Sequence, residues 1–260
     1  MANKLALVTG ASTGIGFELA TLAAREGYDL IVVADEQLIQ AAANDFQQFG
    51  TNVVAVEADL STIEGVDTTL AAAAGRQIDL VCANAGISKG GPFLDESVED
   101  WCHSIDTNVT GTVYLLQKTL RDMVARGSGK ILVTGSIVGY IPGSFNAIYN
   151  ATKAFIDNFT EALRNELKDV EGVTLTTLMP GPTETEFFAR ADMLDTSVGT
   201  SEKADPDKVA KDGWGALFAG KGHIVSGLSN KAQVLASGVV PQAALAEMHR
   251  GMAEPGSGKE

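Results

Sequence analysis

Short apolar runs, many of them rich in β-branched residues, recur along the chain and alternate with longer segments of helical periodicity. Such runs are typical of strands that are buried on both faces of a parallel sheet. We predict strands at 4–9, 30–34, 53–56, 78–82, 131–133, 173–178 and 223–225.

The segments between these strands carry apolar residues three and four positions apart, which is the spacing of one helical face. We predict helices at 15–26, 38–49, 62–74, 98–126, 149–167 and 206–219. The segment 98–126 is either one helix or a helix broken near Asn108. Alternating strands and helices predict an α/β fold with a doubly wound parallel sheet of about seven strands and helices on both faces. So few strands argue against an eight-unit barrel.

The chain shows no linker and no internal repeat, so we expect a single domain over 1–253. The polar segment 195–205 has few apolar residues and is expected to be a mobile loop. The tail 254–260 contains Pro, Gly, Ser and Lys and is expected to be frayed.

Composition narrows the class of protein. Hydrophobic residues make up 45% of the chain and charged residues 20%, which predicts a substantial core. No apolar run is long enough to span a membrane, and the first strand begins too early for a signal peptide, so we expect a cytoplasmic protein. In that compartment Cys82 and Cys102 are expected to be free thiols.

The net charge of −14, from 19 Lys and Arg against 33 Asp and Glu, argues against nucleic acid and anionic membranes as partners. It does not exclude phosphate-bearing ligands, because helix N-termini bind phosphate without cationic side chains. The histidines lack metal-ligand spacing, so we predict no metal site.

A glycine-rich turn follows the first strand and opens the first helix, with glycines at Gly10, Gly14 and Gly16. Glycine lets the backbone turn tightly and brings the helix N-terminus against a pyrophosphate. The spacing differs from the generic Gly-x-Gly-x-x-Gly fingerprint, and a purely structural turn is the alternative. Its position between strand and helix favours a dinucleotide site and therefore a Rossmann-type sheet.

Asp35 ends the second strand, where a carboxylate can accept hydrogen bonds from the ribose hydroxyls of the adenosine. The same carboxylate would repel a 2′-phosphate. No Arg or Lys stands near it, and Thr13 in the glycine turn is neutral, so we expect NAD rather than NADP. The alternative is that Asp35 only caps the turn.

The stretch 130–153 brings three polar groups toward one place. Tyr149 and Lys153 are four residues apart on one helical face, and Ser136 lies where the fifth strand ends. A hydroxyl, a phenol and an ammonium that converge would form a proton-transfer site. The alternative is that Tyr149 packs with its hydroxyl bonded.

The ordered set of motifs resembles the short-chain dehydrogenase/reductase family from residue 4 to about 227. The motifs are Thr9-Gly-x-x-x-Gly-Ile-Gly16, Asp59-Leu60, Asn84-Ala85-Gly86, Asn108, Ser136, Tyr149-x-x-x-Lys153 and Pro180-Gly181. Gly135 departs from the pattern, since many members carry a second Ser there. Pro182 after Pro180-Gly181 is a second departure.

The resemblance implies a role for each of these positions. Tyr149 would be the general acid/base, and Lys153 would hold the nicotinamide ribose and lower the pKa of the phenol. Ser136 would hydrogen-bond the substrate oxygen, and Asn108 would hold a water that links Lys153 to solvent. The implied cofactor contacts are Gly10, Ser12, Thr13, Gly14, Ile15, Gly16, Asp35, Asp59, Leu60, Asn84, Ala85, Gly86, Tyr149, Lys153, Pro180, Gly181, Thr183 and Thr185.

Substrate choice in the family depends on the loop after the sixth strand, here 186–205, and on the segment after Ser136. The candidate substrate contacts are Ile87, Ser88, Ile137, Val138, Phe145, Phe187 and Phe188, with Tyr140 and Met193 nearby. This apolar and aromatic set favours an uncharged alcohol or ketone of moderate size. Core packing is the alternative for about half of these residues.

The resemblance implies an NAD(H)-dependent oxidoreductase that interconverts a secondary alcohol and a ketone. A non-catalytic dinucleotide-binding sensor or scaffold is the alternative, although it would not need Ser136, Tyr149 and Lys153 together. An enoyl reductase fits less well, because that pattern has a longer gap between Tyr and Lys. The family also implies a homodimer or homotetramer through the segments 98–126 and 149–168.

Overall fold

Seven parallel strands form the centre of the molecule, a computed structural model that describes residues 3–258. The strand order is β3-β2-β1-β4-β5-β6-β7, and every neighbouring pair is parallel, as the sequence predicts. The strands are β1 (Leu5–Thr9), β2 (Asp29–Ala34), β3 (Val53–Glu57), β4 (Leu80–Ala83), β5 (Gly129–Thr134), β6 (Val173–Met179) and β7 (His223–Val225).

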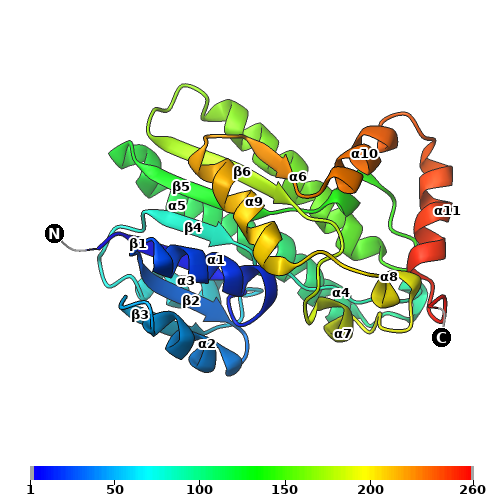
Figure 1. Cartoon of the computed structure of the whole chain (residues 1–260), viewed down its shortest axis with the longest axis horizontal. Helices are drawn as coiled ribbons and strands as arrows, with labels where there is room; N and C mark the ends of the chain where they lie inside the picture. The colour runs from blue at the N-terminus through cyan, green and yellow to red at the C-terminus, as the bar shows by residue number, and fades with distance from the viewer. Residues whose placement is uncertain (1–2, 259–260) are drawn as a thin grey trace.

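Helices cover both faces of this sheet (Figure 1). One face carries α1 (Gly14–Arg25), α2 (Leu38–Gln47) and α9 (Pro206–Phe218), and the other carries α3 (Ile63–Ala71), α5 (Thr112–Arg126) and α6 (Ala147–Glu166). The remaining helices are α4 (Val98–Ile105), α7 (Phe187–Arg190), α8 (Ser197–Thr200), α10 (Leu228–Ser237) and α11 (Gln242–Ala253). Short turns of helix are η1 (Phe93–Asp95), η2 (Asp106–Gly111) and η3 (Ile137–Tyr140).

Side-chain alternation along the strands builds two separate cores. In β1, Ala6 and Val8 pack into the core beneath α1, α2 and α9, whereas Leu5 and Leu7 pack into the core beneath α3, α5 and α6. All of β1 and β2 is buried. Because successive side chains point to opposite faces, a strand covered on both sides must be apolar at nearly every position.

The long segment 98–126 is not one helix. Asp106–Gly111 forms a turn of π-helix between α4 and α5, and Asn108 lies inside it. Such a bulge re-aims side chains and is frequent at functional sites. The alternative of a break near Asn108 is therefore the one that the structure shows.

The expected mobile loop at 195–205 contains α8, and Ala204 forms a β-bridge with Thr183. The expected frayed tail also differs from the structure as far as residue 258. Gly258 N–H donates to the Asp195 carbonyl, and Gly256 N–H donates to the Asp195 carboxylate. Residues 259 and 260 lie outside the described part. Both regions are held in place by contacts between segments that are far apart in the sequence. Composition alone does not indicate such contacts.

The helical hairpin formed by α10 and α11 was not predicted. It stands at the end of the molecule opposite the N-terminus, away from the sheet (Figure 1). Among the described residues, no helix combines the length and the apolar character needed to cross a bilayer. Cys82 and Cys102 are free thiols, as expected.

Candidate active site

A pocket of about 510 Å³ lies at the carboxyl ends of the strands. The strand order reverses between β1 and β4, and ligands of open α/β sheets bind at such a switch point. All of the predicted cofactor residues except Gly16 line this pocket. The structure therefore brings together residues from every predicted cofactor motif.

The glycine turn is sterically forced. Gly10 and Gly14 have positive φ angles of 62° and 58°, a region that residues with a Cβ seldom adopt. A Cβ on Gly16 would overlap the carbonyl of Gly10, so Gly16 is needed behind the turn although it does not line the pocket. A Cβ on Gly14 would lie 2.6 Å from Cγ2 of Thr185, which returns to this turn after β6. The turn leaves the N-terminus of α1 open to the pocket.

Asn84 joins three strands at the base of the pocket. Its amide nitrogen donates to the carbonyls of Thr9 and Gly10 at 3.3 Å each, and its amide oxygen accepts from Thr134 Oγ1 at 3.0 Å. The backbone N–H groups of Asn84 and Ala85 in turn donate to Thr9 Oγ1. The Asn84-Ala85-Gly86 motif therefore steadies the central strands as well as lining the pocket.

The end of the pocket that is predicted to hold the adenosine contains a cation that sequence reasoning missed. Asp35 is exposed on the pocket wall, with Asp59 and Leu60 further along it. The next residue, Glu36, accepts from Ser12 Oγ at 2.5 Å and forms an ion pair with Arg190 of α7 at 2.9 Å. The expectation that no Arg or Lys stands near Asp35 is therefore wrong. A gap of 154 residues in the chain hides this proximity.

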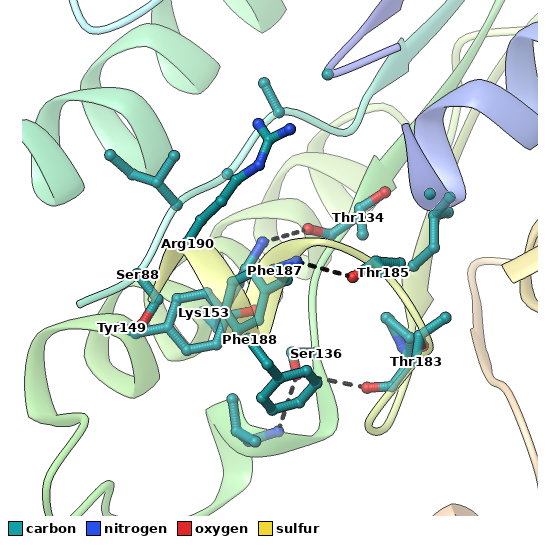
Figure 2. Close-up of a pocket in the computed structure, with 18 of the residues that line it drawn as sticks. Ser88, Thr134, Ser136, Tyr149, Lys153, Thr183, Thr185, Phe187, Phe188 and Arg190 are labelled. Atoms are coloured by element: carbon teal, nitrogen blue, oxygen red, sulfur yellow. Dashed lines mark hydrogen bonds between the residues drawn. The ribbon is translucent and has the colours of Figure 1, made fainter. Parts of the chain in front are cut away.

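Ser136, Tyr149 and Lys153 converge on one wall of the pocket (Figure 2). Tyr149 and Lys153 lie one turn apart on α6, and the Lys153 Nζ atom is 5.6 Å from the centroid of the Tyr149 ring. The Lys153 ammonium donates to the Thr134 carbonyl at 2.8 Å, which anchors it to the end of β5. The Ser136 hydroxyl lies close enough to the Tyr149 phenol to influence its pKa.

The Ser136 hydroxyl is held by weak contacts. It caps η3 by accepting from the Val138 N–H at 3.2 Å, and it donates to the Pro180 carbonyl at a long 3.4 Å. Because the hydrogen bond to Pro180 is near the distance limit, the Ser136 hydroxyl can donate to a substrate oxygen instead at little cost in free energy.

Asn108 does not line the pocket but lies directly behind it. Its amide exchanges two hydrogen bonds of 2.8 Å with the backbone of Ile87 and donates to Thr152 Oγ1 at 3.0 Å. A Cβ on Gly86 would sit 3.2 Å from Asn108 Oδ1 and 3.3 Å from Lys153 Nζ. Gly86 thus leaves a space that both polar groups face, as a water relay would require.

A buried carboxylate, also missed from the sequence, lies one turn beyond Lys153. Neither carboxyl oxygen of Asp157 has a hydrogen-bond partner among the described residues. A Cβ on Gly135 would collide with this carboxylate, and a Cβ on Gly139 would lie 2.6 Å from it. Gly135, the departure from the family pattern, therefore makes room for Asp157. An acidic residue four positions after Lys153 on a buried helix face was the available signal.

Burial dominates the ionisation of these groups. It raises the pKa of Tyr149 above its ordinary value, the charge of Asp157 adds to that shift, and the Ser136 hydroxyl opposes it. Burial lowers the pKa of Lys153 to about 8 against the opposing charge of Asp157, and it raises the pKa of Asp157 to about 7. The expected lowering of the phenol's pKa by Lys153 is thus not what this arrangement produces, because desolvation and Asp157 act in the other direction.

Most of the predicted substrate residues line the pocket, namely Ile87, Ser88, Ile137, Val138, Phe187 and Phe188. Phe187 packs against Tyr149 with ring centroids 5.0 Å apart. Phe145 is the exception, because its positive φ of 62° turns it into a cluster with Phe188, where its ring lies 4.9 Å from the Arg250 guanidinium. Asn146, Gln233, His249 and Met252 line the pocket without having been predicted.

Among residues 3–258, no group of three or more His, Cys, Asp and Glu could hold a metal ion.

Comparisons with known proteins agree with this geometry. A family model described as short chain dehydrogenase matches residues 4–193. An uncharacterized oxidoreductase of Staphylococcus epidermidis is 34% identical over 211 residues, which cover 80% of this chain and 88% of the relative. A short-chain dehydrogenase from Sphingobium yanoikuyae in complex with NADPH is 27% identical, with a TM-score of 0.80 over 92% of this chain and 97% of the other.

A second solved structure supports the fold alone. It is a short chain dehydrogenase/reductase from Burkholderia phymatum in complex with NAD, 23% identical, with a TM-score of 0.80 over 90% of this chain and 92% of that one.

Proposed function

The chain belongs to the short-chain dehydrogenase/reductase family, and from that premise we propose that it interconverts a secondary alcohol and a ketone with a nicotinamide dinucleotide. The observation that carries the proposal is the convergence of Ser136, Tyr149 and Lys153 on one pocket wall. A sensor or scaffold would bind the dinucleotide without needing this arrangement.

The residues present fit a dinucleotide. The glycine turn exposes the N-terminus of α1, and a Cβ at Gly16 would overlap the Gly10 carbonyl and distort the turn. Gly10 to Ile15 would hold the pyrophosphate, Asp35 a ribose, and Asp59 and Leu60 the adenine. Thr183 and Thr185 would meet the carboxamide. The cofactor, when bound, supplies or accepts the hydride.

The chain's own residues handle the proton. Tyr149 stays protonated at neutral pH because burial raises its pKa, so it is ready to donate a proton to a carbonyl oxygen. Ser136 can release its long bond to Pro180 and donate to the same oxygen as charge develops there. Lys153 has donors left besides the one bound to Thr134, and these would hold the ribose. A protonated Tyr149 is the form that ketone reduction requires.

We assign NAD(H) as the preferred cofactor. Asp35 places a carboxylate on the pocket wall at the expected adenosine ribose end, where it would repel a 2′-phosphate. Arg190 is the opposing feature, but its charge is already paired with Glu36. Initial rates with NADH and NADPH test this assignment, and a strong preference for NADPH would overturn it.

Replacing Tyr149 with Phe tests the reaction itself. The substitution removes the proton donor and keeps the ring against Phe187, so turnover of ketones should be abolished while NADH binding stays intact. The readouts are absorbance of reduced nicotinamide and fluorescence titration of NADH. Full turnover by Tyr149→Phe would contradict the mechanism, and tight NADH binding without turnover of any carbonyl by the native chain would favour a sensor.

We also propose a homodimer or homotetramer through α5 and α6. Phe155 on α6 is 44% exposed and stacks on Phe159 with ring centroids 5.6 Å apart, which leaves an aromatic surface on this helix. Light scattering at two concentrations tests the proposal, and a monomer at both would overturn it.

A further inference from the structure

A second cavity, of about 400 Å³, adjoins the catalytic pocket between α10 and α11. Ile141, Gln233, His249 and Met252 line both cavities, so the two spaces share one wall of side chains. The family match ends at residue 193, before this hairpin begins. The second cavity is therefore built mainly by residues that lie beyond the part of the chain matched by the family model.

The lining of the second cavity is apolar beyond that shared wall. Val240 and Leu245 close its inner side, and Ala236 lines it from α10 on the exposed side. An apolar group transferred from water into such a cavity gains affinity of about three- to fourfold for each methylene. Charged groups would lose their hydration without finding a partner.

His249 provides one polar atom at the junction of the two cavities. Its side chain is buried, and its Nδ1 lies 2.8 Å from the Ser144 carbonyl. A carbonyl can only accept, so Nδ1 carries the proton of that bond. Burial lowers the pKa of His249, so the ring is neutral at pH 7 and Nε2 holds a lone pair. No described residue hydrogen-bonds Nε2.

We propose that the substrate is an elongated apolar ketone or alcohol whose body extends past His249 into the cavity between α10 and α11, with a hydroxyl along the body donating to His249 Nε2. The reacting carbon lies at Tyr149, and the far end contacts Val240 and Leu245. This inference rests on the proposed oxidoreductase function and names the substrate class for that site. The argument for this occupant is that the second cavity adjoins the pocket that contains Tyr149, since Ile141, Gln233, His249 and Met252 line both.

A series of 2-alkanones from 2-butanone to 2-dodecanone tests the length of the substrate, with NADH saturating and kcat/KM as the readout. We expect kcat/KM to rise about threefold for each added methylene until the second cavity is filled. Equal values for short and long ketones would overturn the inference while leaving the oxidoreductase function standing. No turnover at any length would instead overturn the proposed function.

Substitutions on the hairpin separate the cavity from a general effect on folding. Ala236→Trp fills the cavity from its exposed side, and it should lower the ratio of kcat/KM for 2-dodecanone to that for 2-butanone at least tenfold. Ala243→Trp is the matched control, because Ala243 is exposed on α11 and lines neither cavity. An equal loss for both ketones in Ala236→Trp, or an unchanged ratio, would overturn the inference.

The role of His249 is tested with long ketones that carry a hydroxyl at successive positions, compared with the unsubstituted ketone. At the favoured position the hydroxyl should raise kcat/KM about two- to tenfold, the range for a neutral hydrogen bond. His249→Phe should remove this gain while keeping the preference for long chains. A gain that persists in His249→Phe, or no gain at any position, would overturn the assignment of the hydrogen bond.

Discussion

The two ends of the candidate active-site pocket are built by different means. At the cofactor end, the backbone of one short turn, Gly10 to Gly16, sets the shape, and a Cβ at Gly16 has no space. At the substrate end, side chains from η3, α7, α10 and α11 form the wall, and these segments are far apart in the sequence. Residue identity is forced where backbone atoms approach each other, whereas a wall of side chains tolerates exchange as long as its volume and polarity suit the ligand.

The proposed catalytic residues Ser136, Tyr149 and Lys153 lie between these ends and share features of both. Their spacing on α6 is a backbone property, but their ionisation depends on burial and on Asp157. Substitutions at the cofactor end, at the centre and in the ion pair that joins the two ends should therefore have effects that differ in magnitude and in the property affected.

Replacing Gly16 with Ala should have the largest effect. The new Cβ overlaps the Gly10 carbonyl, so the turn must open, and we expect a loss of about 3 kcal/mol in the free energy of unfolding. The same distortion should weaken NADH binding about 100-fold or more, since each tenfold change corresponds to about 1.4 kcal/mol. Chemical denaturation and NADH titration at low temperature measure both effects.

Gly215→Ala is the matched control for this substitution. Gly215 is exposed within α9 and a Cβ there would meet nothing within 4 Å, so alanine should stabilise the helix by about 0.5–1 kcal/mol. Native NADH affinity in Gly16→Ala would show that the turn is not forced and would remove the contrast between the two ends.

Asp157→Asn should have an intermediate effect that depends on pH. The folded-state pKa of Asp157 is raised to about 7, so the native chain loses stability as pH rises from about 4 to 7, where the folded protein holds the proton more tightly than the unfolded one. Asparagine removes this loss. Relative to the native chain, the variant should therefore gain on the order of 1–3 kcal/mol between pH 5 and pH 8.

The same substitution should change catalysis. Loss of the Asp157 charge lowers the pKa of both Tyr149 and Lys153, so the alkaline limit of ketone reduction should move to lower pH. Urea denaturation at pH 5 and 8 and a pH–rate profile provide the measurements, with the exposed Asp169→Asn as control. A pH–rate profile identical to that of the native chain would show that Asp157 does not influence the proton-transfer site.

Arg190→Ala should have the smallest effect. The ion pair of Arg190 with Glu36 links the substrate end to the cofactor end, but the Arg190 side chain is 46% exposed, and such pairs contribute about 0–1 kcal/mol. We expect less than about 1 kcal/mol in stability and less than about a fivefold change in the KM for NADH. Glu36→Gln and the double variant complete a cycle. A large coupling energy between the two positions would mean that the two ends are not independent.

Much of the fold was predictable because local constraints specify it. Strands buried on both faces must be almost wholly apolar, and all seven predicted strands are present. Asp205 and Pro206 predict the start of α9, and the Asp205 side chain caps this helix by accepting a hydrogen bond from the Asp207 N–H. The α10–α11 hairpin escaped prediction, because large apolar residues such as Leu235 and Val239 are exposed on it, at 78% and 85%, and it shows no clear buried face.

The candidate site likewise has features that the sequence predicts and features that it does not. The sequence by itself determined the glycine turn, the strand-end positions of Asp35 and Ser136, and the four-residue spacing of Tyr149 and Lys153, because these follow from chain geometry over short distances. Only the tertiary structure placed Arg190 beside Glu36, Asp157 against Gly135, and His249 between the two cavities. These contacts join residues that only the packing of the whole fold brings together. No short stretch of sequence indicates which charges and side-chain volumes will meet there.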